Sequence, residues 1–256
     1  MSFFKKYKFI LIIIFFAGAT QALGFSNAVT SNKTQVPVLV FHNFGEMKDK
    51  ETNLVIHYRI TPAVFEKQMK YLSDNGYAPI SFSTYIDSLK NGAGIPGKAV
   101  VLSFDDGWST QYKYAVPILE KYHFTATFFI ITKSIGGAYM TWDNLKDLVA
   151  HGFDIESHTQ THPKLTKLNQ QKLKDELIGS KKTLEDKLGI KVTTVAYPYY
   201  LQNTNVREAV RYAGYVGARA GWAKFKNSVD HIYEIVAQES VNNPNPFSSH
   251  RLPDLP

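Results

Sequence analysis

The sequence predicts an α/β fold in which about seven parallel strands form a closed or nearly closed barrel. Short runs rich in β-branched and aromatic residues alternate with helical patterns along most of the 256-residue chain. An open doubly wound sheet is the alternative, but no Gly-rich phosphate loop follows the first β-rich run, which disfavours it. The length and the 44% hydrophobic content suit one large domain that folds without disulfides or a structural metal.

The first 28 residues have the layout of a secretory signal. Lys5, Lys6 and Lys8 precede an apolar run over residues 9–19, and small residues follow this run. The run is short for a bilayer span of about 20 residues, although an uncleaved membrane anchor stays open as an alternative. We therefore expect residues 1–28 to direct export to the periplasm, the cell surface or the extracellular space.

Composition excludes several classes of site. The chain has no cysteine, which excludes thiol nucleophiles, thiolate metal sites and attachment through a lipidated cysteine. The formal net charge is +7, but three of the lysines lie in the leader, and no stripe of basic and aromatic residues predicts nucleic-acid binding. We expect one folded domain over residues 35–240 and a flexible tail rich in Asn, Pro and Ser over residues 241–256.

Strands are predicted where short apolar, β-branched and aromatic runs are bounded by turn residues. In chain order, we expect strands at 36–41, 78–80, 98–104, 125–131, 153–156, 192–197, 215–218 and 232–236.

Helices are predicted from apolar residues at helical spacing together with capping signals. At the first helix, Thr61 is the expected N-cap, Pro62 takes the first helical position and Gly76 follows the end. In chain order, we expect helices at 62–75, 84–90, 110–122, 142–150, 170–188 and 206–213.

An acidic pair, Asp105 and Asp106, stands at the end of the strand 98–104 and precedes Gly107. Two adjacent carboxylates in a tight turn repel each other unless positive charge lies beside them, and a divalent cation would supply that charge. One carboxylate could then bind the metal while the other stays free as a base. An ordinary Asp-Gly turn is the alternative interpretation.

His158 and His162 follow the strand 153–156. Histidines four residues apart stand on one face of a helical turn, so both imidazoles can bind one ion. An incidental pair is the alternative, but both this motif and the acidic pair fall at the carboxyl ends of predicted parallel strands, where barrel enzymes collect catalytic groups. Two histidines and one aspartate leave coordination positions open, as a catalytic metal site requires.

The turn Ala196-Tyr197-Pro198-Tyr199 ends the strand 192–197. Pro198 can fix this turn so that the backbone N–H of Tyr199 points into a cleft, where it would stabilise a tetrahedral oxyanion. A packing turn with aromatic filler is the alternative.

The segments Ser-Phe-Asp-Asp-Gly, His-Thr-Gln-Thr-His and Ala-Tyr-Pro-Tyr resemble, in order and spacing, the first three motifs of the carbohydrate esterase family 4 polysaccharide deacetylases, also called the NodB-homology group. The resemblance covers residues 36–236. It implies a distorted (β/α)7 barrel of the NodB-homology type. It also implies metal-dependent hydrolysis of the acetyl groups of a polysaccharide that contains N-acetylglucosamine, with release of acetate.

The resemblance also implies roles for individual residues. Asp105 would be the general base, and the backbone N–H of Tyr199 would bind the oxyanion. Asp106, His158 and His162 would hold a divalent metal, for which zinc is the first candidate and Co²⁺ and Ni²⁺ are alternatives. The expected partner is an N-acetylated polysaccharide or oligosaccharide.

Two positions depart from the family pattern. Ala196 stands where the third motif usually opens with an arginine that orients the base, and the strand 232–236 lacks the usual histidine that acts as general acid. His42 ends the first strand, and a circularly permuted barrel order would bring it to the acid's place. This arrangement resembles the branch that acts on poly-β-1,6-N-acetylglucosamine. A half-buried histidine at a strand end is the alternative.

Four further residues are predicted to contact the sugar, namely Trp108, Pro198, Tyr200 and Trp222. Ordinary core or rim positions are the alternative for each of them. The alternative functions are a catalytically impaired barrel that only binds glycan and a metal-dependent esterase of other substrates, such as a phosphoesterase.

Overall fold

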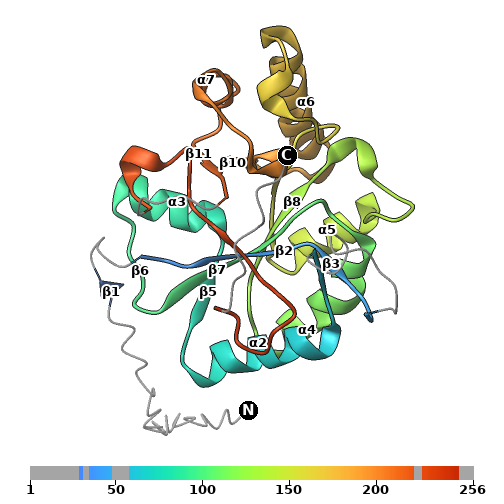
Figure 1. Cartoon of the computed structure of the whole chain (residues 1–256), viewed down its shortest axis with the longest axis vertical. Helices are drawn as coiled ribbons and strands as arrows, with labels where there is room; N and C mark the ends of the chain where they lie inside the picture. The colour runs from blue at the N-terminus through green and yellow to red at the C-terminus, as the bar shows by residue number, and fades with distance from the viewer. Residues whose placement is uncertain (1–28, 31–34, 48–57, 222–226, 248–256) are drawn as a thin grey trace, which may run out of the picture.

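The structure is a computed structural model that describes residues 29–30, 35–47, 58–221 and 227–247 (Figure 1). The predicted leader and Trp222 lie outside the described residues. In the described part, no helix is both long enough and apolar enough to cross a membrane.

The central sheet is parallel throughout and curls into a half-barrel, which confirms the predicted α/β fold class (Figure 1). In spatial order its strands are β11 (Gly217–Arg219), β10 (Thr194–Ala196), β9 (Asp154–Ser157), β8 (Thr127–Ile130), β7 (Ala99–Phe104), β2 (Val38–Phe41) and β12 (Gln238–Glu239), with β5 (Ala78–Ile80) also paired to β7. A parallel bridge between Arg219 and Ile235 links β11 to the segment that leads into β12. This segment therefore spans the gap between the two edges of the sheet.

The first long strand, β2, lies between the last strand and the middle of the sheet. Leu39 pairs with Gln238 of β12 on one side and with Leu102 of β7 on the other. The residue that follows β2 therefore stands at the same rim as the ends of β7 and β12, as the permuted order requires.

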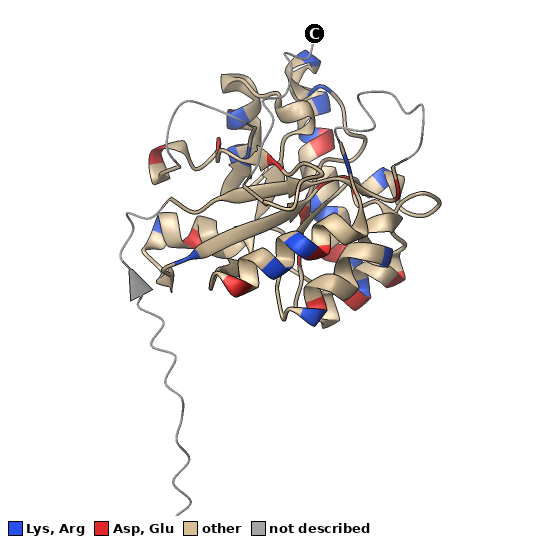
Figure 2. Ribbon diagram, turned by 60° about the horizontal axis from the view of Figure 1, so that its bottom comes forward, with Lys and Arg blue, Asp and Glu red and all other residues tan. Residues whose placement is uncertain are grey.

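The helices surround this sheet. They are α2 (Pro62–Asp74), α3 (Phe82–Asn91), α4 (Val116–Lys121), α5 (Trp142–Ala150), α6 (Gln170–Leu188) and α7 (Thr204–Tyr212). In Figure 2, ribbon segments of acidic and of basic residues are interspersed along the helices. Thr61, Thr141 and Asn169 accept hydrogen bonds from backbone N–H groups as N-caps of α2, α5 and α6, which is why these helices begin where the capping signals predict.

Short elements connect these parts. Two small ladders pair β1 (Val29–Thr30) with β6 (Ile95–Pro96) and β3 (Asn43–Phe44) with β4 (Arg59–Ile60). Single turns of 3₁₀ helix are η2 (Thr132–Ser134), η3 (Leu165–Lys167), η4 (Pro198–Tyr200) and η5 (Val229–His231).

Two predicted elements differ from the structure. In place of the single helix expected at 110–122, the chain forms a π-helix, η1 (Gln111–Ala115), followed by α4. Pro117, in the first turn of α4, has no backbone N–H and so cannot donate the hydrogen bond that a continuous α-helix would need there. The prediction of a strand at 232–236 is wrong. Only Ile235 forms a bridge there, and the pairing with β2 begins later, at Gln238, where the backbone lies parallel to β2.

Alternate residues of the strands enter two separate cores, because successive side chains of a strand point to opposite faces. Leu39 and Phe41 belong to the core beneath the outer helices, while Val38 and Val40 face the core that α3 covers with Tyr85. In the outer core, the ring of Phe104 stacks on Phe41 and on Phe128, with centroids 5.1 and 4.7 Å apart, and meets Phe65 edge-on. This aromatic cluster lies directly beneath the acidic turn that follows β7.

The first residues of the predicted tail pack against the domain. Gln68 of α2 donates hydrogen bonds from its amide to the carbonyls of Val241 and Asn243, at 3.0 and 2.6 Å. The ring of Phe247 packs on Tyr71 and Tyr77. Residues 248–256 lie outside the described residues.

Replacing Phe104 by Ala should lower the free energy of unfolding by about 3–5 kcal/mol, because the substitution leaves a cavity among four rings. Urea denaturation followed by far-UV circular dichroism measures this loss. Tyr212→Ala is the matched control, since Tyr212 is 68% exposed, and its loss should stay below about 1 kcal/mol. Equal losses for the two variants would contradict the assignment of Phe104 to the core.

Candidate active site

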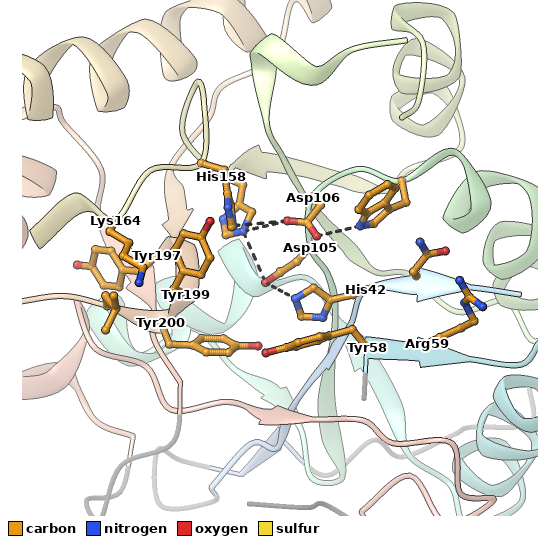
Figure 3. Close-up of a pocket in the computed structure, with 14 residues that line it drawn as sticks. His42, Tyr58, Arg59, Asp105, Asp106, His158, Lys164, Tyr197, Tyr199 and Tyr200 are labelled. Carbon is orange, nitrogen blue, oxygen red and sulfur yellow. Dashed lines mark hydrogen bonds and ion pairs between the residues drawn. The ribbon is translucent and has the colours of Figure 1, made fainter. Parts of the chain in front are cut away.

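A pocket with a cavity volume of about 580 Å³ opens at the carboxyl ends of the strands (Figure 3). Eight residues predicted from sequence line it: His42, Asp105, Asp106, Trp108, His158, His162, Tyr199 and Tyr200. Asn43, Tyr58, Arg59, Lys164, Tyr197 and Leu201, which the sequence analysis missed, complete the lining. The size of the cavity lies in the range of pockets that take small molecules.

Asp106, His158 and His162 converge as a three-donor cluster. Oδ1 of Asp106 lies 3.5 Å from Nε2 of His158 and 3.6 Å from Nε2 of His162, and the three donor atoms lie within 4.8 Å of one another. The prediction that a helical turn joins the two histidines is wrong. Thr159 and His162 adopt left-handed backbone conformations, with φ of 68° and 59°, and the resulting loop rather than a helix face brings the imidazoles together.

The donor set fits a divalent cation. Nδ1 of His158 lies 2.8 Å from the carbonyl of Ala196, and because a carbonyl only accepts, this nitrogen carries the proton and Nε2 keeps its lone pair for a metal. Burial lowers the pKa of His158, and burial together with the neighbouring His158 lowers the pKa of His162 to about 4, so both rings are neutral at pH 7. One carboxylate and two imidazoles are typical of zinc and also suit Co²⁺ or Ni²⁺.

Trp108 supports this donor set from the side. Its indole N–H donates to Oδ2 of Asp106 at 2.9 Å, which leaves Oδ1 facing the imidazoles. The Trp108 ring stacks on Tyr139 with centroids 4.5 Å apart. The predicted sugar-binding residue therefore lines the pocket, and it also holds a candidate metal ligand in place.

Asp105 is paired with a guanidinium instead of belonging to the three-donor cluster. Nη2 of Arg219 forms a hydrogen-bonded ion pair with Oδ2 of Asp105, and the two residues are 0% and 2% exposed. Burial by itself would raise the pKa of Asp105, but the positive charge of Arg219, together with the neighbouring His158 and His42, outweighs burial and lowers it. Asp105 is therefore an ionised carboxylate whose Oδ1 has no hydrogen-bond partner among the described residues.

A guanidinium therefore reaches Asp105 from β11, although Ala196 in β10 lacks one. Arg219 ends β11, which pairs with β10 so that Ala196 lies opposite Arg219. A charged residue at the end of the predicted apolar strand 215–218 was the signal that could have revealed it.

His42 stands beside Asp105 and an unpredicted carboxylate. Its Nε2 lies 3.7 Å from Oδ2 of Asp105, and its Nδ1 lies 3.4 Å from Oε2 of Glu239 in β12. Burial alone would lower the pKa of His42, but the negative charge of Glu239, together with those of Asp105 and Asp106, raises it to about 9. His42 therefore carries a proton at neutral pH in the metal-free protein.

Left-handed backbone conformations are concentrated at this pocket. Besides Thr159 and His162, the described non-glycine residues with positive φ include Asp106, Tyr199 and Tyr200, at 73°, 56° and 59°. Such conformations cost free energy and persist where the surrounding structure imposes them, which is common at functional sites. The residues of all three predicted motifs are thus held in strained turns.

The strained turn η4 places Tyr199 in the lining of the pocket. The carbonyls of Tyr197 and Pro198 accept hydrogen bonds from the N–H groups of Tyr200 and Leu201, and the direction of the Tyr199 N–H stays a prediction. The Tyr199 ring packs on His162 with centroids 4.6 Å apart.

Of the other predicted sugar contacts, Tyr200 lines the pocket and Pro198 does not. Pro198 is buried beneath the turn, so a direct contact with substrate is not observed for it. Trp222 lies outside the described residues. In Figure 3 the hydroxyls of Tyr58 and Tyr200 point toward each other below His42.

The comparisons with known proteins agree with this geometry. The sequence model of the polysaccharide deacetylase family matches residues 93–218. The Bacillus subtilis protein YxkH, provisionally named a polysaccharide deacetylase, is 32% identical over 187 residues, which cover 73% of this chain and 64% of that protein. The poly-beta-1,6-N-acetyl-D-glucosamine N-deacetylase of Staphylococcus aureus is 30% identical over 173 residues, which cover 62% of this chain and 59% of that protein. The chain thus spans less than two thirds of the length of these two relatives.

Solved structures share the fold. The Streptococcus pyogenes deacetylase PplD in complex with acetate superposes with a TM-score of 0.77 and 24% identity, covering 83% of this chain and 95% of that one. A polysaccharide deacetylase from Bacillus cereus superposes with a TM-score of 0.70 and 27% identity, covering 80% of this chain and 65% of that one.

Removing the guanidinium should destabilise the protein strongly. Arg219→Met leaves the buried Asp105 carboxylate without its partner, and we expect a loss of about 3–5 kcal/mol in the free energy of unfolding of the metal-free protein at pH 7. The double variant Asp105→Asn/Arg219→Met should lose less, because a neutral amide does not need a cation. Urea denaturation of the four proteins of this cycle measures the coupling.

The same pair should give a pH dependence. The folded-state pKa of Asp105 lies below its unfolded value, so the stability that Arg219 contributes is present above about pH 4 and is lost as the pH falls through the lowered pKa. If the double variant Asp105→Asn/Arg219→Met has a free energy of unfolding as low as that of Arg219→Met, the pairing of Asp105 with Arg219 is contradicted.

Proposed function

Because the chain belongs to the polysaccharide deacetylase family, we propose that it hydrolyses the N-acetyl groups of a polysaccharide that contains N-acetylglucosamine and releases acetate. The observation that carries this proposal is the division of labour between two adjacent carboxylates. Asp106 faces two neutral imidazoles, while Asp105 is ionised and held by Arg219 a few ångströms away in the same pocket. A metal that polarises the carbonyl and a separate base that activates water together suffice to hydrolyse an unreactive amide.

The base in this mechanism is Asp105. A divalent ion held by Asp106, His158 and His162 would polarise the acetyl carbonyl and make a water more acidic. Asp105 takes the proton from the attacking water, whose oxygen forms a bond to the acetyl carbon. Arg219 binds one carboxylate oxygen, so the free Oδ1 is the atom that accepts the proton.

The general acid is His42. Its proton goes to the amide nitrogen as the C–N bond breaks, which produces acetate and a free amine. Glu239 lies against the other ring nitrogen and favours the protonated form of the ring. The backbone N–H of Tyr199 stabilises the negative charge that develops on the carbonyl oxygen, a contribution of about 3 kcal/mol for a well-placed donor.

The substrate we favour is an exported poly-β-1,6-N-acetylglucosamine or a cell-wall glycan. The named activity of the Staphylococcus aureus relative supports the first. Trp108, Tyr200 and Tyr58 supply aromatic surface around the cavity on which sugar rings can stack. We further propose that residues 1–28 direct the protein out of the cytoplasm, to the periplasm, the cell surface or the extracellular space, where such polymers lie.

Replacing Asp105 by Asn tests the reaction directly. We expect turnover on an N-acetylglucosamine oligomer to fall by a factor on the order of 10²–10⁴ because the proton acceptor is lost, while bound metal stays near one ion per chain. Acetate release and metal content measure the two quantities. The exposed Asp186→Asn on α6 is the control and should keep both. Near-full activity of Asp105→Asn would exclude Asp105 as the base.

His42→Gln should discriminate between substrates by their leaving groups. Amine release needs a proton from the acid, so kcat on an N-acetylglucosamine oligomer should fall by about 10²–10⁴, whereas hydrolysis of p-nitrophenyl acetate, whose phenolate leaves unaided, should fall far less. Steady-state kinetics on both substrates measures the ratio. An equal loss on both substrates would argue that His42 serves another purpose.

The polymer is identified by assaying freed amines. Metal-loaded protein is incubated in parallel with poly-β-1,6-N-acetylglucosamine, peptidoglycan and chitin oligomers, and the Asp105→Asn protein serves as the blank. The natural class should give the highest kcat/KM. Release of acetate from none of them, with metal bound, would favour the glycan-binding or esterase alternative.

A further inference from the structure

The loop Thr159–His162 joins the two histidines of the metal cluster, and it cannot support itself by regular hydrogen bonding. Two of its residues, Thr159 and His162, have positive φ, so consecutive peptide groups do not point along one helix axis. Within the loop, the N–H of His162 donates to Oγ1 of Thr159 at 3.1 Å. The remaining peptide groups depend on other elements.

A carboxylate from α6 meets two of these peptide groups. Oε2 of Glu176 accepts hydrogen bonds from the N–H groups of Gln160 and Thr161, at 2.8 and 2.9 Å. Its Oε1 accepts from the hydroxyl of Thr161 at 2.6 Å. Successive backbone N–H groups beside a left-handed residue form a concave anion site, and hydrogen bonds to a charged acceptor are the stronger kind.

The opposite side of the loop is fixed by η2. The N–H groups of Thr132 and Lys133 donate to the carbonyls of Thr159 and Gln160, at 3.2 and 2.9 Å. The helix α6 also comes very close to the loop, since a Cβ at Gly179 would lie only 2.4 Å from Nε2 of Gln160. The loop is therefore held between η2 and α6, and Glu176 is the charged contact on the α6 side.

The two metal-binding histidines differ in how they are anchored. His158 continues directly from β9, its N–H donates to the carbonyl of Ile130 at 2.9 Å, and its ring is bound to Ala196. His162 follows Thr161 immediately, and within the described residues its ring contacts the rings of His158 and Tyr199 and the Asp106 carboxylate. A displacement of the Gln160–Thr161 peptide would therefore move His162 and leave His158 in place.

We propose that Glu176 is a positioning residue of the metal centre, whose carboxylate fixes the loop so that the imidazole of His162 completes the three-donor set. The inference rests on the proposed function, because it concerns the metal that the cluster would hold. Glu176 touches neither the metal donors nor the substrate pocket, and it acts through the backbone of the loop.

The test compares Glu176→Gln with Asp186→Asn. Both variants remove one negative charge from α6, but among the described residues Asp186 pairs with the exposed Lys182 one turn away and lies outside the loop contacts. Zinc affinity is measured by competition with a chelating dye, and the environment of the ion by the visible absorption of the Co²⁺-loaded protein. We expect zinc binding by Glu176→Gln to weaken about 10–100-fold with an altered cobalt spectrum, because the amide donates where the carboxylate accepted. Asp186→Asn should stay within about twofold of the unsubstituted chain with an unchanged spectrum.

A second variant covers the case in which Glu176→Gln does not fold. Thr161→Val removes one of the three hydrogen bonds and leaves α6 intact, so it should weaken zinc binding by a smaller factor in a protein with an unchanged circular dichroism spectrum. If the unsubstituted chain binds zinc and both loop variants bind it equally well with the same cobalt spectrum, this inference is overturned and the proposed function stands. If the unsubstituted chain binds no zinc or cobalt, the proposed function and the inference are overturned together.

Discussion

The buried ion pair between Asp105 and Arg219 allows two adjacent carboxylates to share one turn. Asp105 and Asp106 would repel each other strongly in a pocket of low polarity, and burial alone would raise the pKa of Asp105. Arg219 balances the charge of Asp105 from inside the sheet, while Asp106 turns toward imidazoles and an indole N–H. The left-handed backbone at Asp106 directs the two side chains apart, so that each carboxylate meets a different set of partners.

The order of the strands brings the remaining groups to this turn. Asp105, His42 and Glu239 end or follow three neighbouring strands, β7, β2 and β12, and Arg219 ends β11 at the other edge of the curled sheet. A flat sheet would keep β11 and β12 far apart, whereas curling and the bridge at Ile235 bring their ends to one pocket. The charge balance at Asp105 therefore depends on the curling of the sheet, which brings Arg219 to it.

Much of the site could be predicted from sequence because its signals are local. The acidic pair, the two histidines and the Tyr199 turn are short motifs at the ends of strands, and the helices α5 and α6 are bounded by caps that are visible in the chain. Arg219 and Glu239 could not be assigned roles in the same way. Arg219 meets a partner 114 residues away, and Glu239 stands in a two-residue strand that exists only because β2 is there to pair with it. The spacing of the two histidines predicts a helical turn, but the segment is a loop, because its conformation is imposed by contacts with α6 and η2 rather than by its own residues.

The pairing of β2 with β12 joins segments roughly 200 residues apart, and it fixes the order in which the pocket can be completed. Contacts that close such long loops lose the most chain entropy and form late in folding. A chain that is still being synthesised has Asp105, Asp106 and both histidines before Glu239 has emerged. Its sheet can bring the three-donor cluster together, but β2, which His42 follows, then lacks the strand that pairs with its other edge. The side of the pocket at His42 is therefore the last part to assemble, and the site of a nascent chain is incomplete until β12 has paired with β2.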